Sequence, residues 1–231
     1  MSDRMPLARQ VRSAVEDCPP REVPRRLCEV LSGGLPVDAV TMSLLTDTPS
    51  RQLLCASNEM ATAIEEVQFT MAEGPCITAA SEGEPVHLTD WAAGSRRWPL
   101  FAPALRERCP DIEAVHAFPL WLGDYVLGAL DMACRTPGGM PQAAIEQAIE
   151  ASHAVAQALI PAQRLLSAED PAPPWEPADA VRAHWSDTHR AIGVVMHRRK
   201  ISSETALALM RARAFATGRN LREITTDILN S

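Results

Sequence analysis

The sequence predicts an α+β protein in which a domain built on an antiparallel sheet precedes a small all-α domain of three helices. Two pairs of strand-like segments lie in the first 135 residues, and a proline-rich stretch at 167–178 interrupts the regular pattern. After that stretch, the apolar residues recur at helical spacing. The length of 231 residues suits two domains of ordinary size.

Turn residues separate the two members of each strand pair. Segments 38–47 and 51–58 flank a Thr-Pro-Ser turn and predict a hairpin. Residues 114–135 predict two further strands joined at Gly123-Asp124. Both pairs are therefore expected to be antiparallel.

Helical segments are expected between and after the strand pairs. We expect a helix at 76–81, a short strand at 85–88, a loop that carries two tryptophans, and another short helix. Helices packed on an antiparallel sheet form an α+β layer arrangement. The Ala-rich residues 141–160 then predict a long helix, which Pro161 should kink or end.

Net charge divides the chain into two unequal parts. Residues 180–231 hold nine Lys/Arg and four Asp/Glu, a net charge of +5. The whole chain carries −7, which leaves −12 for residues 1–179. This asymmetry indicates that residues 180–231, called the tail below, bind a polyanion. Residues 1–179, called the body, then have a different function.

The six cysteines lack the short spacing of a zinc site or of a thioredoxin-like pair. We therefore expect six reduced and mostly buried thiols, with a reactive or sensing thiol as the alternative. No apolar run approaches the roughly 20 residues of a membrane span, and the first residues lack the apolar core of a signal peptide. The expected location is the cytoplasm, without membrane contact.

Three short motifs follow one another in the body: Gly74-Pro75-Cys76, Gly83-Glu84-Pro85-Val86, and Pro119-Leu120 followed by Gly128-Ala129-Leu130. The first permits a sharp turn into a helix, and the last permits close approach of a neighbouring element. In this order they make roughly residues 23–166 resemble the GAF domain that is fused to an ANTAR domain in bacterial regulators. The resemblance implies a sensor with a concave pocket for a small ligand.

Residues 90–105 are expected to form a wall of that pocket, facing the strands. Their aromatic and cationic side chains are the candidate ligand-binding residues: Trp91, Arg96, Arg97, Trp98 and Phe101. The alternative is that the aromatic residues cap the core of the sheet. The ligand and any cofactor are unknown from the sequence.

No catalytic site and no metal site is expected from the sequence. Glu65 and Glu66 lie on a segment expected to be solvated, and neither His87 nor His116 belongs to a catalytic signature. The alternative to a non-enzymatic regulator is a GAF-type thiol redox enzyme or sensor whose helical tail mediates oligomerisation. Its nucleophile would be Cys76, at a helix N-terminus where the dipole favours a thiolate.

Capping residues divide the end of the chain into three helices. The first ends near the basic run 198–200, Ser202 or Ser203 begins the second, Gly218 ends it, and Asn220 with Glu223 forms a capping box for the third. Residues 188–229 resemble the ANTAR domain, an RNA-binding module of transcription antiterminators. The matching residues include Ala191, Gly193, Met196, Ile201, Ser202, Ala206, Leu209, Arg211, Phe215, Gly218, Leu221 and Ile224.

The resemblance implies that paired stem-loops of a leader transcript are bound so that a terminator hairpin cannot form. Cations would neutralise RNA phosphates, and small residues would permit close backbone approach. The expected RNA-binding residues are Arg190, Gly193, Arg198, Arg199, Lys200, Ala206, Arg211, Arg213, Arg219 and Arg222. A DNA-binding regulator is the rival interpretation of this tail.

We therefore expect four parts: an N-terminal segment at 1–22, a GAF-like sensor domain at 23–166, a proline-rich linker at 167–178 and an ANTAR domain at 179–231. Two routes of control fit them. Either the acidic body masks the basic tail electrostatically, or the helices at 141–160 and around Trp185 form a homodimer interface that aligns two RNA-binding domains. The resemblance favours a homodimer, since two hairpins would be bound by two tails.

Overall fold

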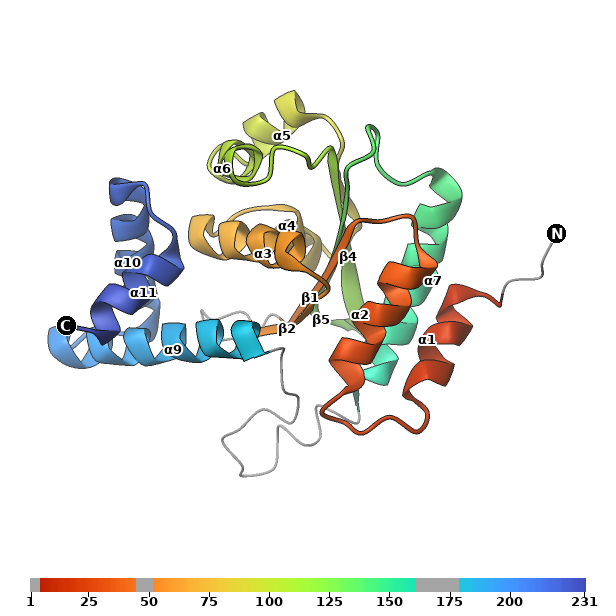
Figure 1. Cartoon of the computed structure of the whole chain (residues 1–231), viewed down its shortest axis with the longest axis horizontal. Coiled ribbons are helices and arrows are strands. Elements are labelled where there is room, and N and C mark those ends of the chain that lie inside the picture. The colour runs from red at the N-terminus through yellow and green to blue at the C-terminus, as the bar shows by residue number, and fades with distance from the viewer. Residues whose placement is uncertain (1–4, 45–51, 161–178) are drawn as a thin grey trace.

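A five-stranded antiparallel sheet stands at the centre of the protein (Figure 1). The computed structural model describes residues 5–44, 52–160 and 179–231, so the expected linker lies outside the described residues. The strands, in sheet order, are β2 (Gln52–Ala56), β1 (Ala39–Leu44), β5 (Tyr125–Cys134), β4 (Ala114–Leu122) and β3 (Val86–Leu88). The α+β fold class and both strand pairs are confirmed.

Three helices cover one face of this sheet: α1 (Leu7–Val15), α2 (Val23–Gly34) and α7 (Gln142–Ala158). Helices α2 and α7 pack against the sheet, where alternate strand residues such as Val40 and Met42 face them, and α1 packs on α2 and α7. The helix expected at 141–160 is α7. Its buried stripe is mostly alanine, whereas Ile145 and Ile149 are only partly buried.

Four helices lie against the opposite face: α3 (Glu59–Met71), α4 (Pro75–Glu82), α5 (Trp91–Arg97) and α6 (Phe101–Arg108). The expected loop with two tryptophans is therefore wrong, because its first part is helix α5. The side chain of Asp90 caps that helix by accepting hydrogen bonds from the backbone N–H groups of Ala92 and Ala93, at 2.8 and 3.2 Å.

Helix α3 is absent from the sequence-based expectations. Asn58 begins it by accepting a hydrogen bond from the backbone N–H of Ala61 at 3.0 Å. The segment was expected to be solvated at Glu65 and Glu66, but both side chains are buried. The helix has polar groups on its buried surface, so its sequence lacks a simple apolar stripe.

The end of the chain forms three helices as expected: α9 (Asp179–Arg199), α10 (Ser203–Thr217) and α11 (Leu221–Leu229). Ser202 accepts a hydrogen bond from the Thr205 backbone N–H at 3.2 Å, Gly218 is left-handed with φ 61°, and Asn220 and Glu223 form the capping box. No helix within the described ranges combines the length and the apolar character that crossing a membrane would require.

One pair of cysteines departs from the expected reduced state. Cys28 on α2 and Cys55 on β2 form a disulfide, with their Cα atoms 6.6 Å apart. The two residues are separated by 27 positions in sequence, and only the packing of α2 against β2 brings them together. Cys18, Cys76, Cys109 and Cys134 are not part of a disulfide.

Two histidines lie side by side on β3 and β4. The Nδ1 atoms of His87 and His116 are 2.9 Å apart, and His116 Nε2 accepts a hydrogen bond from the backbone N–H of Met140 at 3.1 Å. Since Nε2 accepts, the proton of neutral His116 is on Nδ1, which donates to His87. Burial, together with the adjacent His87, lowers the pKa of His116 to about 4.

We expect the free energy of unfolding to decrease as the pH falls from about 6.5 to about 4. In the unfolded chain His116 takes up a proton near its ordinary pKa of 6.5, whereas in the folded chain it resists until about 4, so acid favours the unfolded state in this window. The full shift corresponds to about 3 kcal/mol. Urea unfolding between pH 7 and 4 measures this change. The free energy of unfolding of His116→Gln should depend less on pH than that of the wild type. His153→Gln, on the exposed side of α7, should behave as the wild type.

The close contact between β5 and β1 requires glycine at position 128. A Cβ on Gly128 would lie 2.0 Å from the backbone oxygen of Ser43, which cannot move without breaking the strand pair. We expect Gly128→Ala to lower the free energy of unfolding by about 2–3 kcal/mol. Gly33→Ala in α2 is the control, because a Cβ there meets nothing within 4 Å and alanine favours helix. Equal stability of the two variants would contradict this account of the sheet.

Candidate nucleic-acid interface

The basic run at the end of α9 is exposed. Arg198, Arg199 and Lys200 stand where the helix carbonyls have no further helical partners, so the helix dipole favours positive charge there. Lys200 adopts a left-handed conformation with φ 54°, which ends the helix. Arg198 donates a hydrogen bond from Nη1 to Ser231 Oγ at 3.0 Å, and this contact joins the end of α9 to the end of the chain.

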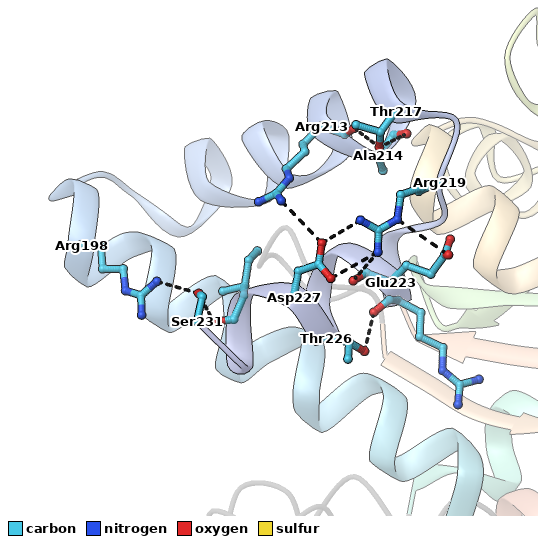
Figure 2. A network of polar contacts seen from close by, with 11 residues as sticks. Arg198, Arg213, Ala214, Thr217, Arg219, Glu223, Thr226, Asp227 and Ser231 are labelled. Carbon is cyan, nitrogen blue, oxygen red and sulfur yellow. Dashed lines mark hydrogen bonds and ion pairs between the residues drawn. The ribbon is translucent and has the colours of Figure 1, made fainter.

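A groove of about 290 Å³ opens between α9, α10 and α11. Its lining residues are Val195, Arg198, Arg199, Leu209, Met210, Arg213, Ile224, Ile228 and Ser231. Met210 and Ile224 are buried and form its floor, while the arginines are exposed and form its rim. The groove therefore combines an apolar interior with cations from two helices. Figure 2 shows two of these cations, Arg198 on α9 and Arg213 on α10.

A second hollow lies along α9 itself. It is lined by Arg190, Gly193, Val194, His197 and Arg198, so three of the expected RNA-binding residues share one surface. A Cβ on Gly193 would meet nothing within 4 Å, which shows that the space above this residue is open. Arg190 forms an ion pair with Asp187 at 3.0 Å, but its side chain remains 71% exposed.

Arg213 and Arg219 share a carboxylate within the three-helix domain (Figure 2). Arg219 binds Asp227 through both terminal nitrogens, at 2.7 and 3.3 Å, and Arg213 reaches the same carboxylate at 3.5 Å. Hydrogen bonding to Arg219 lowers the pKa of the Asp227 carboxyl. Arg219 thus fixes α11 relative to the preceding turn, and Arg213 is the more exposed of the two arginines.

Arg211 and Arg222 face the α+β domain. Arg211 donates from Nε to the backbone oxygen of Phe69 at 2.8 Å, and its guanidinium lies 4.9 Å from the centre of the Phe69 ring. Arg222 approaches Glu66 at 3.9 Å, and Arg108 approaches the same carboxylate at 3.4 Å. Burial raises the pKa of Glu66, while the two arginines oppose that shift.

Apolar contacts reinforce this docking. Leu53 of β2 and Phe69 of α3 belong to the same buried cluster as Ile192, Met210 and other core residues of the three-helix domain. Sequence reasoning missed Phe69 and Glu66 as functional candidates, since nothing in their local pattern indicates that a distant helix packs on them. Only the topology of the folded chain reveals this contact.

Ala206, expected to permit close approach of RNA, is fully buried in the core of the three-helix domain. Its small side chain therefore serves helix packing in this arrangement, and it offers no surface to a polyanion. The other nine candidates of this set lie on the surface or at the domain contact, as described above.

The candidate ligand-binding residues are distributed over α5 and α6. Trp98 and Phe101 are buried in the core below these helices, and Trp98 Nε1 donates to Thr78 Oγ1 at 3.0 Å. Trp91 Nε1 donates to the backbone oxygen of Glu113 at 3.0 Å. Arg97 stacks on Trp98 and forms an ion pair with Glu82, whereas Arg96 is exposed. These contacts satisfy the aromatic residues internally, and a role in ligand binding stays a prediction.

The structure defines the class of protein: an α+β domain followed by a cationic three-helix domain. Residues 19–160 match the family model of the GAF domain, and residues 186–229 match that of the ANTAR domain. The chain therefore belongs to the GAF domain family and carries an ANTAR domain after its GAF domain. GAF domains are sensors, and ANTAR domains are RNA-binding modules of transcription antitermination.

Solved structures show the same α+β fold. The GAF domain of a phosphoenolpyruvate-protein phosphotransferase from Acinetobacter is 13% identical, with 71% of this chain and 98% of that chain covered and a TM-score of 0.54. The corresponding domain from Coxiella burnetii is 17% identical, with 70% and 95% covered and a TM-score of 0.53. No curated protein sequence matches this chain.

Proposed function

We propose that this protein is a cytoplasmic, signal-responsive regulator that binds RNA stem-loops in leader transcripts and prevents transcription termination. The observation that carries the proposal is the exposed set of cations on α9 and α10 around an apolar groove, within a domain that matches the ANTAR model. Cations there would contact phosphates, and the apolar floor would accept an unstacked base.

We propose that the docked arrangement is the resting state. Arg211 and Arg222, two of the expected RNA contacts, are engaged by Phe69 and Glu66 of the GAF domain. The masking route expected from net charge thus takes the form of specific contacts at one helix, α3. A signal that moves α3 would release both arginines for RNA.

Homodimerisation is the second route of control. Two hairpins would be bound by two tails, and the partly buried Ile145 and Ile149 on α7 offer apolar surface for a second copy of the chain. The two routes differ in what they require of the GAF–ANTAR contact, because only masking makes that contact inhibitory.

The alternative of a thiol redox enzyme has less physical support. Reactive cysteines lie in electropositive, partly exposed surroundings. Cys76 is fully buried, and the carboxylates of Glu65 and Asp131 lie within 4.8 Å of its sulfur. This environment disfavours a thiolate nucleophile that must reach a substrate. DNA binding is the other alternative, and a comparison of RNA with duplex DNA decides between the two nucleic acids.

We expect Arg198→Ala and Arg199→Ala each to weaken binding of a two-hairpin leader RNA about three- to tenfold. Each change should also reduce the slope of log affinity against log salt by about one, because one phosphate contact is lost. Filter binding over a salt series measures both quantities. Arg12→Ala, an exposed cation on α1 of the GAF domain, is the matched control. Equal losses in all three variants would place the RNA elsewhere.

We expect Glu66→Gln to strengthen RNA binding severalfold at low salt, since it removes the charge that faces Arg222 and leaves every ANTAR residue intact. Glu82→Gln is the control, because that carboxylate pairs with Arg97 inside the GAF domain. Unchanged or weaker binding in Glu66→Gln would exclude masking and favour control by dimerisation.

A further inference from the structure

Strand β2 lies between the GAF domain and the three-helix domain (Figure 1). It stands at one end of the sheet order and pairs with β1. Helix α2 of the GAF domain contacts this strand, and so does α9 of the three-helix domain. A change in how β2 is held can therefore reach the docked three-helix domain directly.

A β-bulge directs neighbouring residues of β2 into different cores. Met42 of β1 pairs with Cys55 of β2. The next residue of β1, Ser43, pairs with Leu53, so Leu54 is an extra residue on β2. Leu54 and Cys55 belong to the apolar core that α2 and α7 share with the sheet. Leu53, which is only 2% exposed, belongs instead to the core of the three-helix domain.

The Cys28–Cys55 disulfide is the covalent link between β2 and α2. Both cysteines are buried in the folded chain, so a reductant reaches the bond when the strand opens locally. β2 is only five residues long and lies at the edge of the sheet. Short elements with few partners open at a lower free energy than the core of a domain. The disulfide is therefore placed where a thiol reagent gains access without global unfolding.

A dithiol reduces such a bond in two exchange steps. One thiolate of the reagent attacks a cysteine sulfur and forms a mixed disulfide, and the second thiol of the reagent then displaces that cysteine. Two electrons and two protons pass to the protein, which ends with two thiols. The reagent ends as a cyclic disulfide, and oxidation of the two cysteines reverses the reaction.

We propose that the Cys28–Cys55 disulfide is a redox switch that sets how firmly the three-helix domain is docked on the GAF domain. In the oxidised chain, the bond holds β2 to α2 and keeps Leu53 in the core that it shares with α9. In the reduced chain, only pairing with β1 and packing hold β2, so this docking contact loosens. The consequence for RNA rests on the proposed function, because release of Arg211 and Arg222 matters only if they bind RNA.

Hydrogen exchange of the full chain, with and without dithiothreitol, tests docking in the absence of RNA. Alkylation of the folded chain first establishes that the reagent yields two additional reactive thiols. We expect the amides of β2 and α9 to exchange at least about threefold faster in the reduced chain, and those of α5 and α6 to be unchanged. No additional thiols, equal exchange at α9, or faster exchange throughout the chain would each overturn the proposal.

Cys28→Ala/Cys55→Ala should exchange like the reduced wild type in both conditions. Cys109→Ser alters a cysteine outside the disulfide and should keep the response to dithiothreitol. A response that survives in the double variant would contradict the assignment. If the double variant does not fold, Leu53→Ala replaces it. Dithiothreitol should then change exchange at α9 less than in the wild type, and an undiminished response would exclude this route.

Affinity for a two-hairpin leader RNA is then measured for the oxidised and the reduced wild type. We expect the reduced chain to bind about three- to tenfold more tightly, because Arg211 and Arg222 leave their partners on α3. Equal affinity despite faster exchange at α9 would overturn the regulatory role of the disulfide. Absence of RNA binding in both states would instead contradict the proposed function, and hydrogen exchange would still decide whether the disulfide controls docking.

Discussion

The packing of Phe69 against the three-helix domain is the contact on which the relation between the two domains depends. A domain of only three helices buries a small core by itself. Here Phe69 and Leu53 from the GAF domain join that core, and Arg211 covers the Phe69 ring while binding its backbone oxygen. Helix α3 is therefore fixed on two sides. Glu65 and Gln68 bind partners toward the sheet, and Glu66 and Phe69 bind partners toward the tail.

Because α3 contacts the three-helix domain as well as the sheet, the cations of the tail fall into groups with different roles. Arg219 is held by Asp227 and stabilises the fold of the domain, and Arg211 and Arg222 are turned toward α3. Arg198, Arg199 and Lys200 remain exposed at the end of α9. The net charge of +5 therefore overstates the surface that is available to RNA in this arrangement. A change at α3 would alter that surface without any change in composition.

Turn and capping residues in the sequence are sufficient to predict the two hairpins and the last helices. Turn residues predicted the two hairpins, and the caps at Ser202, Gly218 and Asn220 predicted the boundaries of the last helices. Helix α3 has a capping residue, Asn58, but no simple apolar stripe, because polar groups lie on its buried surface. The Cys28–Cys55 disulfide depends on contact between distant segments, so no local pattern indicates it. The candidate site could be predicted only in part, because some of its features also depend on contacts between distant segments. Exposed cations follow from composition, whereas the engagement of Arg211 and the burial of Ala206 follow from tertiary packing alone.

The central claim is that the tail of this protein recognises RNA. It is tested most directly by the affinity of the full-length chain for a two-hairpin leader RNA and for duplex DNA of equal length, measured over the same salt series. The account predicts a clear preference for RNA, together with a salt slope that reports several phosphate contacts. Equal and weak binding to both nucleic acids would contradict it, and the cations around the groove would then serve another partner or only solvation.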